Sequence, residues 1–427
     1  MFARCCKGCF GTNRRPSRAD LESLPSEPGA LMPAVTSEPS APSSLAERRA
    51  LKEWLGRSDD FDFDEAYKAD TARFRSKMAR SGVYPFIRWR VWRAAAGCSE
   101  IYRPDLYDEV RLAVTLNVRW AFEQRSSHDL SQSFEAPSVS GRSLRSGDLH
   151  QVDSSERERI EEIVSLVKQD LSRTFPCSEF YSDDCNLARL GNVIVSYAAL
   201  NKDVGYCQGM NFLAGTLLRL SNSEQETFWM LTLVMVRYNL QSLFRHEIPL
   251  LHLLKFQFQA LLKELMPELE RHFERLYVLP ELYAVKWFFS LFAYSVPENL
   301  IFPIWDFIFA GSPPKQQHTG VPRAMLLVAL GIVRTLEKKL LKARTVTDVI
   351  AELEGSLRNM KSAEGLLSAT RKLDRKISQA SLEGLRGVWA ELNPAGNDAI
   401  SKGELVALLM PSAILDWEGL RKELSAA

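Results

Sequence analysis

Apolar residues along most of this chain recur every three or four positions, which is the spacing of one face of an α-helix. The clearest stripe starts at Ile160 and ends at Phe175, directly before Pro176. Because a residue that precedes proline disfavours helical backbone, we expect this helix to end there and Arg173 to lie in its final turn. We find no alternating runs joined by hairpin turn residues. The pattern therefore predicts an all-α protein.

Two stretches lack this periodicity. The first lies within the first 46 residues and is rich in Pro, Ser and Ala, which predicts a disordered leader, with folded structure beginning near Glu47. The second, residues 125–156, is polar and Ser-rich and lies between helical segments, so we expect a disordered insertion that loops out of the domain. The predicted parts are a tail (1–46), a multi-helix domain (47–373) and a small helical extension (374–427).

Composition narrows the class of protein. Hydrophobic residues make up 46% of the 427 positions and charged residues 25%, which is ordinary for a globular protein. The net charge of +1 gives no support for a nucleic-acid partner. The longest apolar stretches are shorter than the ~20 residues that cross a bilayer, and no secretory signal is evident. Seven cysteines without framework spacing favour a reducing compartment. We expect a cytoplasmic protein.

The predicted helix carries a charged pair near its end. Asp170 flanks the apolar stripe, and Arg173 lies further round, within reach of the carboxylate. An arginine held in this way can project from the helix toward a partner. Taken alone, however, such a pair is most often an exposed ion pair that contributes little.

A second motif, Gly-Tyr-Cys-Gln-Gly-Met-Asn, begins at Gly205. Gly205 and Gly209 bracket Tyr206 and Gln208, and glycine permits a partner's backbone to come close. The amide of Gln208 offers a donor and an acceptor, as orienting a water molecule requires. The alternative is a glycine-rich turn before the next helix, with Gln208 merely solvated. We interpret Cys207 as a small packed side chain rather than a nucleophile, because no His or basic residue is near it in sequence.

Together the two motifs closely resemble those of the TBC-domain GTPase-activating proteins for Rab GTPases, whose pattern is Ile-x-x-Asp-x-x-Arg followed by Tyr-x-Gln. Val167 replaces the isoleucine. The resemblance implies that Arg173 and Gln208 are catalytic fingers, supplied in trans to a Rab in its GTP state. It also implies an activator in vesicle trafficking that is not itself an enzyme and has no cofactor of its own, because the partner binds GTP and Mg²⁺. A non-catalytic Rab-binding scaffold and a membrane adaptor remain as alternatives.

Other segments extend the resemblance to roughly residues 82–373. Arg88 and Trp92 match the family's Arg-x-x-x-Trp, and we expect a structural role in which the guanidinium lies over the indole. That helix, from Phe86 to Ala96, has Pro85 at its start and Gly97 as its C-cap. Downstream matches are residues 286–289 and 304–306, where Pro303 replaces a usual arginine, and the final helices between Val346 and Leu373.

The two flanks carry weaker signals. Cys5, Cys6 and Cys9 lie among basic residues, so S-acylation with peripheral binding to endomembranes is one hypothesis and an unmodified tail the other. Zinc binding is disfavoured, since no second ligand pair follows. Near the other end, residues 393–404 resemble an EF-hand loop but lack two of its key residues. We expect a helix-loop-helix that packs without calcium.

Overall fold

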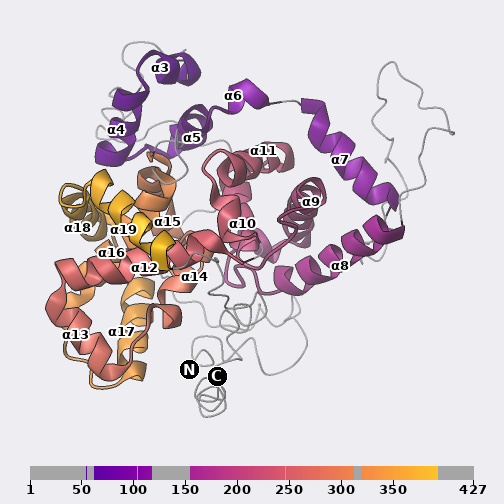
Figure 1. The fold of residues 1–427 in the computed structure, drawn as a ribbon. Coiled ribbons are helices and arrows are strands. Elements are labelled where there is room, and N and C mark those ends of the chain that lie inside the picture. The colour runs from indigo at the N-terminus through magenta and orange to yellow at the C-terminus, as the bar shows by residue number, and fades with distance from the viewer. Residues whose placement is uncertain are drawn as a thin grey trace, which may run out of the picture. The chain divides into compact units, whose positions relative to one another are not determined.

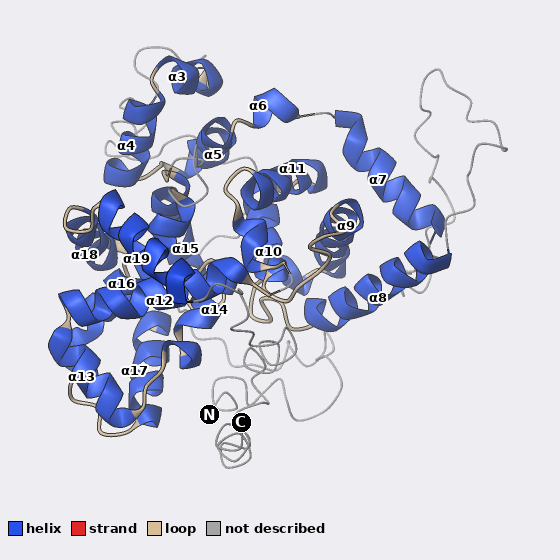
Figure 2. Cartoon of the chain, in the orientation of Figure 1, coloured by secondary structure: helices blue, strands red, loops and turns tan. Residues whose placement is uncertain are grey.

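Every regular element that the structure describes is helical (Figures 1 and 2). The expected all-α class is therefore confirmed for these residues. The tail over residues 1–46, most of the insertion and the EF-hand-like segment lie outside them, so the statements about those parts stay predictions. This computed structural model describes Trp54 and residues 62–102, 104–117, 154–245, 247–311 and 320–392.

The N-terminal helices are set by their caps. Asp62 accepts hydrogen bonds from the first backbone N–H groups of α3, and Asp70 does the same for α4. Gly97 ends α5 in the left-handed conformation (φ 69°, ψ 41°), which confirms the predicted end of this helix. Its start differs from the prediction, because Pro85 begins a short 3-10 helix and α5 itself starts at Arg88. These elements are α3 (Phe63–Ala69), α4 (Thr71–Ser81), η2 (Pro85–Ile87), α5 (Arg88–Ala96), α6 (Cys98–Ile101) and α7 (Pro104–Asn117).

The middle of the chain is built around α9, which contacts α7, α8, α10 and α11 (Figure 1). Buried residues of the predicted stripe, such as Val167, fix the orientation of α8 against this group. The helix α8 begins at Ser154, so the predicted insertion extends slightly too far, because its last residues form the first turn of α8. The elements are α8 (Ser154–Leu171), η3 (Phe180–Ser182), α9 (Asp184–Leu200), α10 (Met210–Ser221), α11 (Glu224–Val236) and η4 (Leu240–Leu243).

The C-terminal part surrounds α16, which is buried along most of its length and contacts α12, α14, α15, α17 and α18. The expected helices between Val346 and Leu373 are present as α17 and α18. Pro303, which replaces the family's arginine, lies inside α15. The elements are α12 (Pro249–Leu265), α13 (Pro267–Leu276), η5 (Pro280–Leu282), α14 (Ala284–Phe289), α15 (Glu298–Phe309), α16 (Val321–Leu340), α17 (Val346–Arg358), α18 (Glu364–Asp374) and α19 (Gln379–Leu392).

The described part of the helical extension packs on the domain. Gln257 of α12 donates a hydrogen bond of 3.0 Å to the Leu382 carbonyl of α19. The rings of Phe256 and Trp389 lie 5.3 Å apart between the same two helices. Since α12 also contacts α16, the extension continues the helical core at this point. None of the described helices has the length and apolar character to cross a membrane.

Candidate functional site

The backbone leaves the helical path just before Arg173. The last residue of α8 is Leu171, and Arg173 lies in the turn beyond it, with its N–H donating to the Asp170 carbonyl at 3.1 Å. The prediction that Arg173 lies within the helix's final turn was wrong by a short margin. The reason lies in the turn itself, where the chain reverses into a left-handed Phe175 (φ 48°) before Pro176. The Arg173 side chain is 34% exposed, so it stays accessible at the surface.

The carboxylate of Asp170 joins the two motifs. One oxygen, Oδ1, accepts from Arg173 Nε at 2.8 Å and also from Nη2. The other, Oδ2, accepts from the Tyr206 hydroxyl at 2.5 Å. Burial, followed by the adjacent Asp170 carboxylate, raises the pKa of Tyr206 well above its ordinary value, so the phenol remains a donor. Asp170 is itself buried, and it holds Arg173 on one side and Tyr206 on the other.

A second bridge lies beside the first. Thr174 Oγ1 donates to the Asp170 carbonyl at 2.7 Å and accepts from Asn211 Nδ2 at 2.7 Å. Asn211 Oδ1 in turn accepts the Gly209 N–H at 2.9 Å. The two bridges meet the loop on either side of Gln208, since Tyr206 precedes it and Asn211 follows it. The loop is therefore fastened to the end of α8 at both edges.

Sequence reasoning assigned no role to Thr174 or Asn211. Asn211 closes the second motif, and Thr174 directly follows Arg173. The available signal was a polar residue directly after Arg173 and another three residues after Gln208. It was not enough to pair them, because nothing local indicates that these two side chains meet.

Gln208 is almost completely buried, with 9% of its surface exposed. Its Oε1 atom is buried and accepts no hydrogen bond from the described residues. The alternative of a merely solvated turn glutamine is therefore wrong. A buried acceptor without a donor costs about 1–3 kcal/mol. The neighbouring Cys207 is 2% exposed, which fits its interpretation as a packed side chain.

The two glycines of the motif have different roles. At Gly209 the backbone has φ 108°, and an added Cβ would lie 2.9 Å from the Phe289 carbonyl oxygen. The close approach is therefore made by α14 of this same chain, which corrects the expectation of a partner's backbone at that glycine. At Gly205 (φ 59°) no atom lies within 4 Å of an added Cβ. Gly205 alone of the two leaves open space beside the loop.

Groups from later helices reach the same region. Tyr294 packs edge-on against Phe212 of α10, with ring centroids 5.1 Å apart. Burial and then the Glu354 carboxylate raise the pKa of Tyr294, while Arg358 and Arg173 act in the opposite direction. Lys286 forms an ion pair with Glu354. Tyr294 thus lies within the electrostatic influence of both Arg173 and charged residues of α17, which no motif in the sequence predicted.

Arg88 and Trp92 form a separate cluster around the buried Asp306. Arg88 Nε and Trp92 Nε1 donate to Asp306 Oδ1 at 3.0 and 2.9 Å, and the Val83 N–H donates to Oδ2 at 3.0 Å. Burial raises the pKa of Asp306, and these donors oppose the shift. The guanidinium lies 5.5 Å from the centre of the Phe302 ring. Arg88 therefore pairs with Asp306 and does not lie over Trp92, which corrects that detail.

The fold has solved counterparts. A Chlamydomonas flagellar RabGAP TBC domain aligns with 78% of this chain and 97% of its own, with a TM-score of 0.52 and 18% identity. The Ypt/Rab-GAP domain of Gyp1p aligns with 78% and 98%, with a TM-score of 0.54 and 14% identity. At this level of identity the likeness establishes the shared fold.

Sequence comparison identifies the family. Mouse TBC1 domain family member 4 is 30% identical over 232 residues, which are 53% of this chain and 17% of that protein. Human Growth hormone-regulated TBC protein 1 is 34% identical over 212 residues, 48% of this chain and 58% of that protein. The chain thus matches less than two thirds of the length of these relatives. The model of the Rab-GTPase-TBC domain matches residues 85–341, more than half of the chain. The chain belongs to the Rab-GTPase-TBC domain family.

Proposed function

We propose that this protein is a GTPase-activating protein for a small GTPase of the Rab family in its GTP-bound state. The observation that carries the proposal is the bridge from Arg173 through Asp170 to Tyr206, which holds an arginine and the loop of Gln208 together. In this proposal the partner binds GTP and Mg²⁺, and the activator completes the partner's active site. It is therefore not an enzyme by itself and has no cofactor of its own.

Arg173 supplies positive charge to the transferred phosphoryl group. An arginine finger accelerates hydrolysis roughly 10³–10⁵-fold, which corresponds to about 4–7 kcal/mol of transition-state stabilisation. Asp170 binds the guanidinium through Nε and Nη2, so one edge of the group is oriented before the partner arrives. Such preorganisation matters, because misplacement of a catalytic group by ~1 Å can cost about 100-fold in rate.

Gln208 positions the attacking water. Its Oε1 is a buried acceptor without a donor among the described residues, so in this proposal a small movement of the side chain on binding lets it accept from a water molecule. The amide NH₂ supplies a donor on the same side chain. With Gln208 in place, the pair of fingers comes from one protein, and the GTPase's own glutamine becomes less important.

The two alternative functions do not need the catalytic side chains of this site. A Rab-binding scaffold needs surface complementarity but neither finger, and this chain retains both. A membrane adaptor would depend on Cys5, Cys6 and Cys9, which lie outside the described residues. As an activator of a Rab the protein would regulate vesicle trafficking, in the cytoplasm or peripherally on endomembranes.

The test is single-turnover release of phosphate from a panel of Rab–GTP complexes, with the purified full chain. We expect at least one Rab to respond by about 10³-fold or more, and Arg173→Ala to abolish the response. Arg157→Ala is a matched control, because Arg157 lies on the same helix and pairs with Glu161 in an exposed i,i+4 position. Rab binding without acceleration by the wild-type protein would support the scaffold instead, and equal loss in both variants would contradict the role of Arg173.

A further inference from the structure

A pocket of about 640 Å³ lies between α16 and α18. It falls in the volume range of small-molecule sites, about 300–1,000 Å³. None of its lining residues belongs to the two motifs around Arg173 and Gln208, so it is separate from the proposed activating site. Leu373 is buried at its base, and Gly365 leaves one edge open, since nothing lies within 4 Å of an added Cβ there.

The pocket is lined by cations and by no carboxylate. Arg334 comes from α16, and Lys372, Arg375 and Lys376 come from the end of α18 and the residues after it. Lys372 and Lys376 are exposed and have no side-chain hydrogen bond or ion pair with any described residue. The acidic groups nearby are already engaged, because Asp374 pairs with Arg323 and Glu337 pairs with Arg334. Glu337 therefore balances the charge of Arg334, whereas the charges of Lys372 and Lys376 have no carboxylate partner among the described residues.

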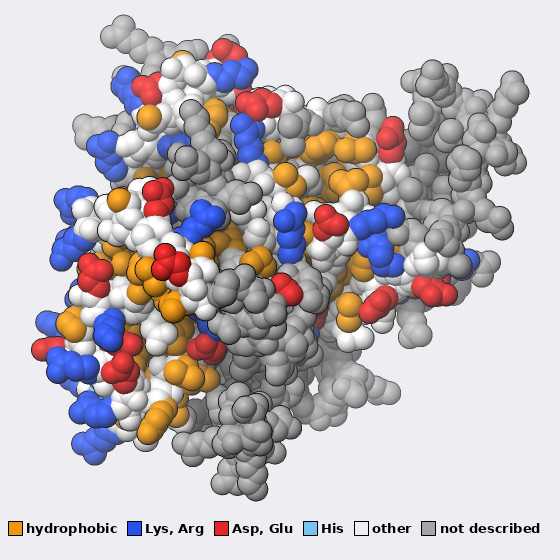
Figure 3. All heavy atoms as spheres, in the orientation of Figure 1, with side chains coloured by type: hydrophobic (Ala, Val, Ile, Leu, Met, Phe, Trp, Pro, Cys, Tyr) orange, Lys and Arg blue, Asp and Glu red, His pale blue; other side chains and the backbone are white. Residues whose placement is uncertain are grey.

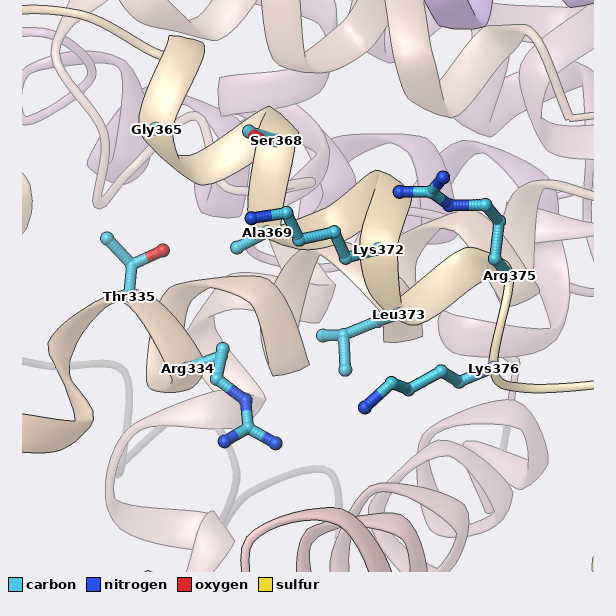
Figure 4. Close-up of a pocket in the computed structure, with 9 residues that line it drawn as sticks. All are labelled: Arg334, Thr335, Gly365, Ser368, Ala369, Lys372, Leu373, Arg375 and Lys376. Carbon is cyan, nitrogen blue, oxygen red and sulfur yellow. The ribbon is translucent and has the colours of Figure 1, made fainter.

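Two of these cations lie on opposite walls. In Figure 4, Arg334 of α16 and Lys376 of the turn after α18 extend toward each other across the pocket, and Lys372 lies above them beside Ala369. Arg334 is fixed in place, because its Nη2 donates to the Leu265 carbonyl at 2.6 Å. The half-buried Ser368 adds a neutral hydroxyl at the upper edge (Figure 4). On the face shown in Figure 3, Lys and Arg side chains gather along the left edge, over α13 and α18.

We propose that this pocket binds a small ligand that carries two or more phosphate groups. Arginine and lysine are the side chains that bind phosphate, and cations on two facing walls match anionic groups at two ends of one ligand. The same chemistry occurs in the headgroup of a phosphorylated lipid and in a free polyphosphate. The compact volume favours such a ligand over a longer phosphorylated peptide.

The positions of the lysines also have a purely structural explanation. Cations near a helix C-terminus interact favourably with the helix dipole, and Lys372 is in the last turn of α18. That explanation does not account for Arg334, which approaches from α16. It does extend to Lys376, which lies just beyond the last residue of α18.

The experiment measures binding to the full chain with two probes. Inorganic triphosphate is titrated calorimetrically, and vesicles of phosphatidylcholine with phosphatidylinositol bisphosphate are sedimented beside phosphatidylserine vesicles of equal surface charge. The test variant is Lys372→Gln with Lys376→Gln. The control is Lys68→Gln with Arg73→Gln, two exposed cations on α3 and α4 whose loss changes the net charge equally. Ala369→Glu is a second test variant, because its carboxylate is placed to pair with Lys372 and to repel an anion.

We expect the wild-type protein and the control to bind triphosphate, and both test variants to bind it about tenfold more weakly or worse. The melting temperatures and the GTPase stimulation of all four proteins should be unchanged. Binding of triphosphate alone assigns the site to a soluble polyphosphate. Additional selective binding of the bisphosphate vesicles assigns it to a lipid headgroup. The proposal is overturned if wild type binds neither probe, or if the control loses as much affinity as the test variants.

Discussion

Tyr206 donates a hydrogen bond of 2.5 Å to Oδ2 of Asp170, 36 residues earlier in the chain. The same carboxylate binds Arg173 through Oδ1. The tyrosine of the second motif and the aspartate of the first are thus two halves of one connection. This explains in physical terms why Asp-x-x-Arg and Tyr-x-Gln occur together, because one carboxylate, that of Asp170, binds both Arg173 and the tyrosine beside Gln208.

Removal of the Tyr206 hydroxyl should weaken both the fold and the activity. Tyr206→Phe leaves a buried carboxylate oxygen without its donor, so we expect the free energy of unfolding to fall by about 1–3 kcal/mol. The stimulated GTPase rate should fall by up to about 100-fold, because Arg173 loses part of its support. Chemical denaturation and single-turnover hydrolysis measure the two effects. Tyr277→Phe is the control, since Tyr277 is 77% exposed.

The effect of Tyr206→Phe has a defined pH dependence. The folded-state pKa of Tyr206 lies above its ordinary value. A raised pKa means that the hydrogen-bonded phenol contributes its full stability below the unfolded pKa of about 10 and loses it only as pH rises through the folded value. The stability difference between wild type and variant should therefore be constant from about pH 6 to 9. A difference that shrinks within this window would contradict the assignment.

The second bridge gives a prediction of its own. Thr174→Val keeps the shape of the side chain but deprives Asn211 Nδ2 of its acceptor. We expect a loss of about 1–3 kcal/mol in unfolding free energy and a lower stimulated rate, because one edge of the Gln208 loop is released. Thr232→Val is the matched control, since Thr232 bonds only within its own helix, to the Phe228 carbonyl. Equal rates for the two variants would show that the bridge does not position the loop.

The two motif glycines should respond differently to alanine. Gly209→Ala brings a Cβ within 2.9 Å of the Phe289 carbonyl oxygen. This steric clash adds to the cost of a positive φ, so we expect the free energy of unfolding to fall by more than about 2 kcal/mol. The Cβ added by Gly205→Ala meets no other atom, so only the backbone cost of a positive φ applies, and the free energy of unfolding should fall by about 1–2 kcal/mol. Denaturant melts of both proteins test this order. The reverse order would mean that α14 does not confine the loop.

The Asp306 cluster should affect stability without affecting the chemistry. Arg88→Met leaves Asp306 buried without its ionic partner, which costs about 3–5 kcal/mol. Lys68→Met removes an exposed ion pair with Glu65 and should leave the free energy of unfolding nearly unchanged. At a temperature where both proteins are folded, we expect wild-type GTPase stimulation per folded molecule. A specific loss of rate in Arg88→Met would place this cluster in the activating site.

Periodicity predicted helices well, and long-range contacts poorly. The stripe that ends at Phe175 predicted α8, because burial against α9 repeats at helical spacing. It did not show that the helix stops before Arg173, since that depends on a turn held by Asp170 and Thr174. The glycine at 209 was identified as special, but its neighbour Phe289 could not be, because the contact joins helices distant in sequence.

The partners of Arg88 illustrate the same limit. Its place one turn before Trp92 suggested stacking between the two, but both donate to Asp306 on α15. A buried carboxylate attracts every donor within reach, and its position depends on how α5 and α15 pack. The same holds for Tyr294, whose pKa is influenced by both Glu354 and Arg173 and which carries no motif of its own.

In the proposed function, Arg173 and Gln208 act as one unit in trans. The most direct test of this is a single-turnover double-mutant cycle with Arg173→Ala, Gln208→Ala and the double variant, each on a normal Rab and on a Rab whose own switch glutamine is changed to alanine. We expect the two single variants to lose about the same rate and the double variant little more, because groups that act as a unit are not additive. The altered Rab should still respond to the wild-type protein. An altered Rab that does not respond at all, or a Gln208→Ala protein that is fully active on normal Rab, would contradict the account.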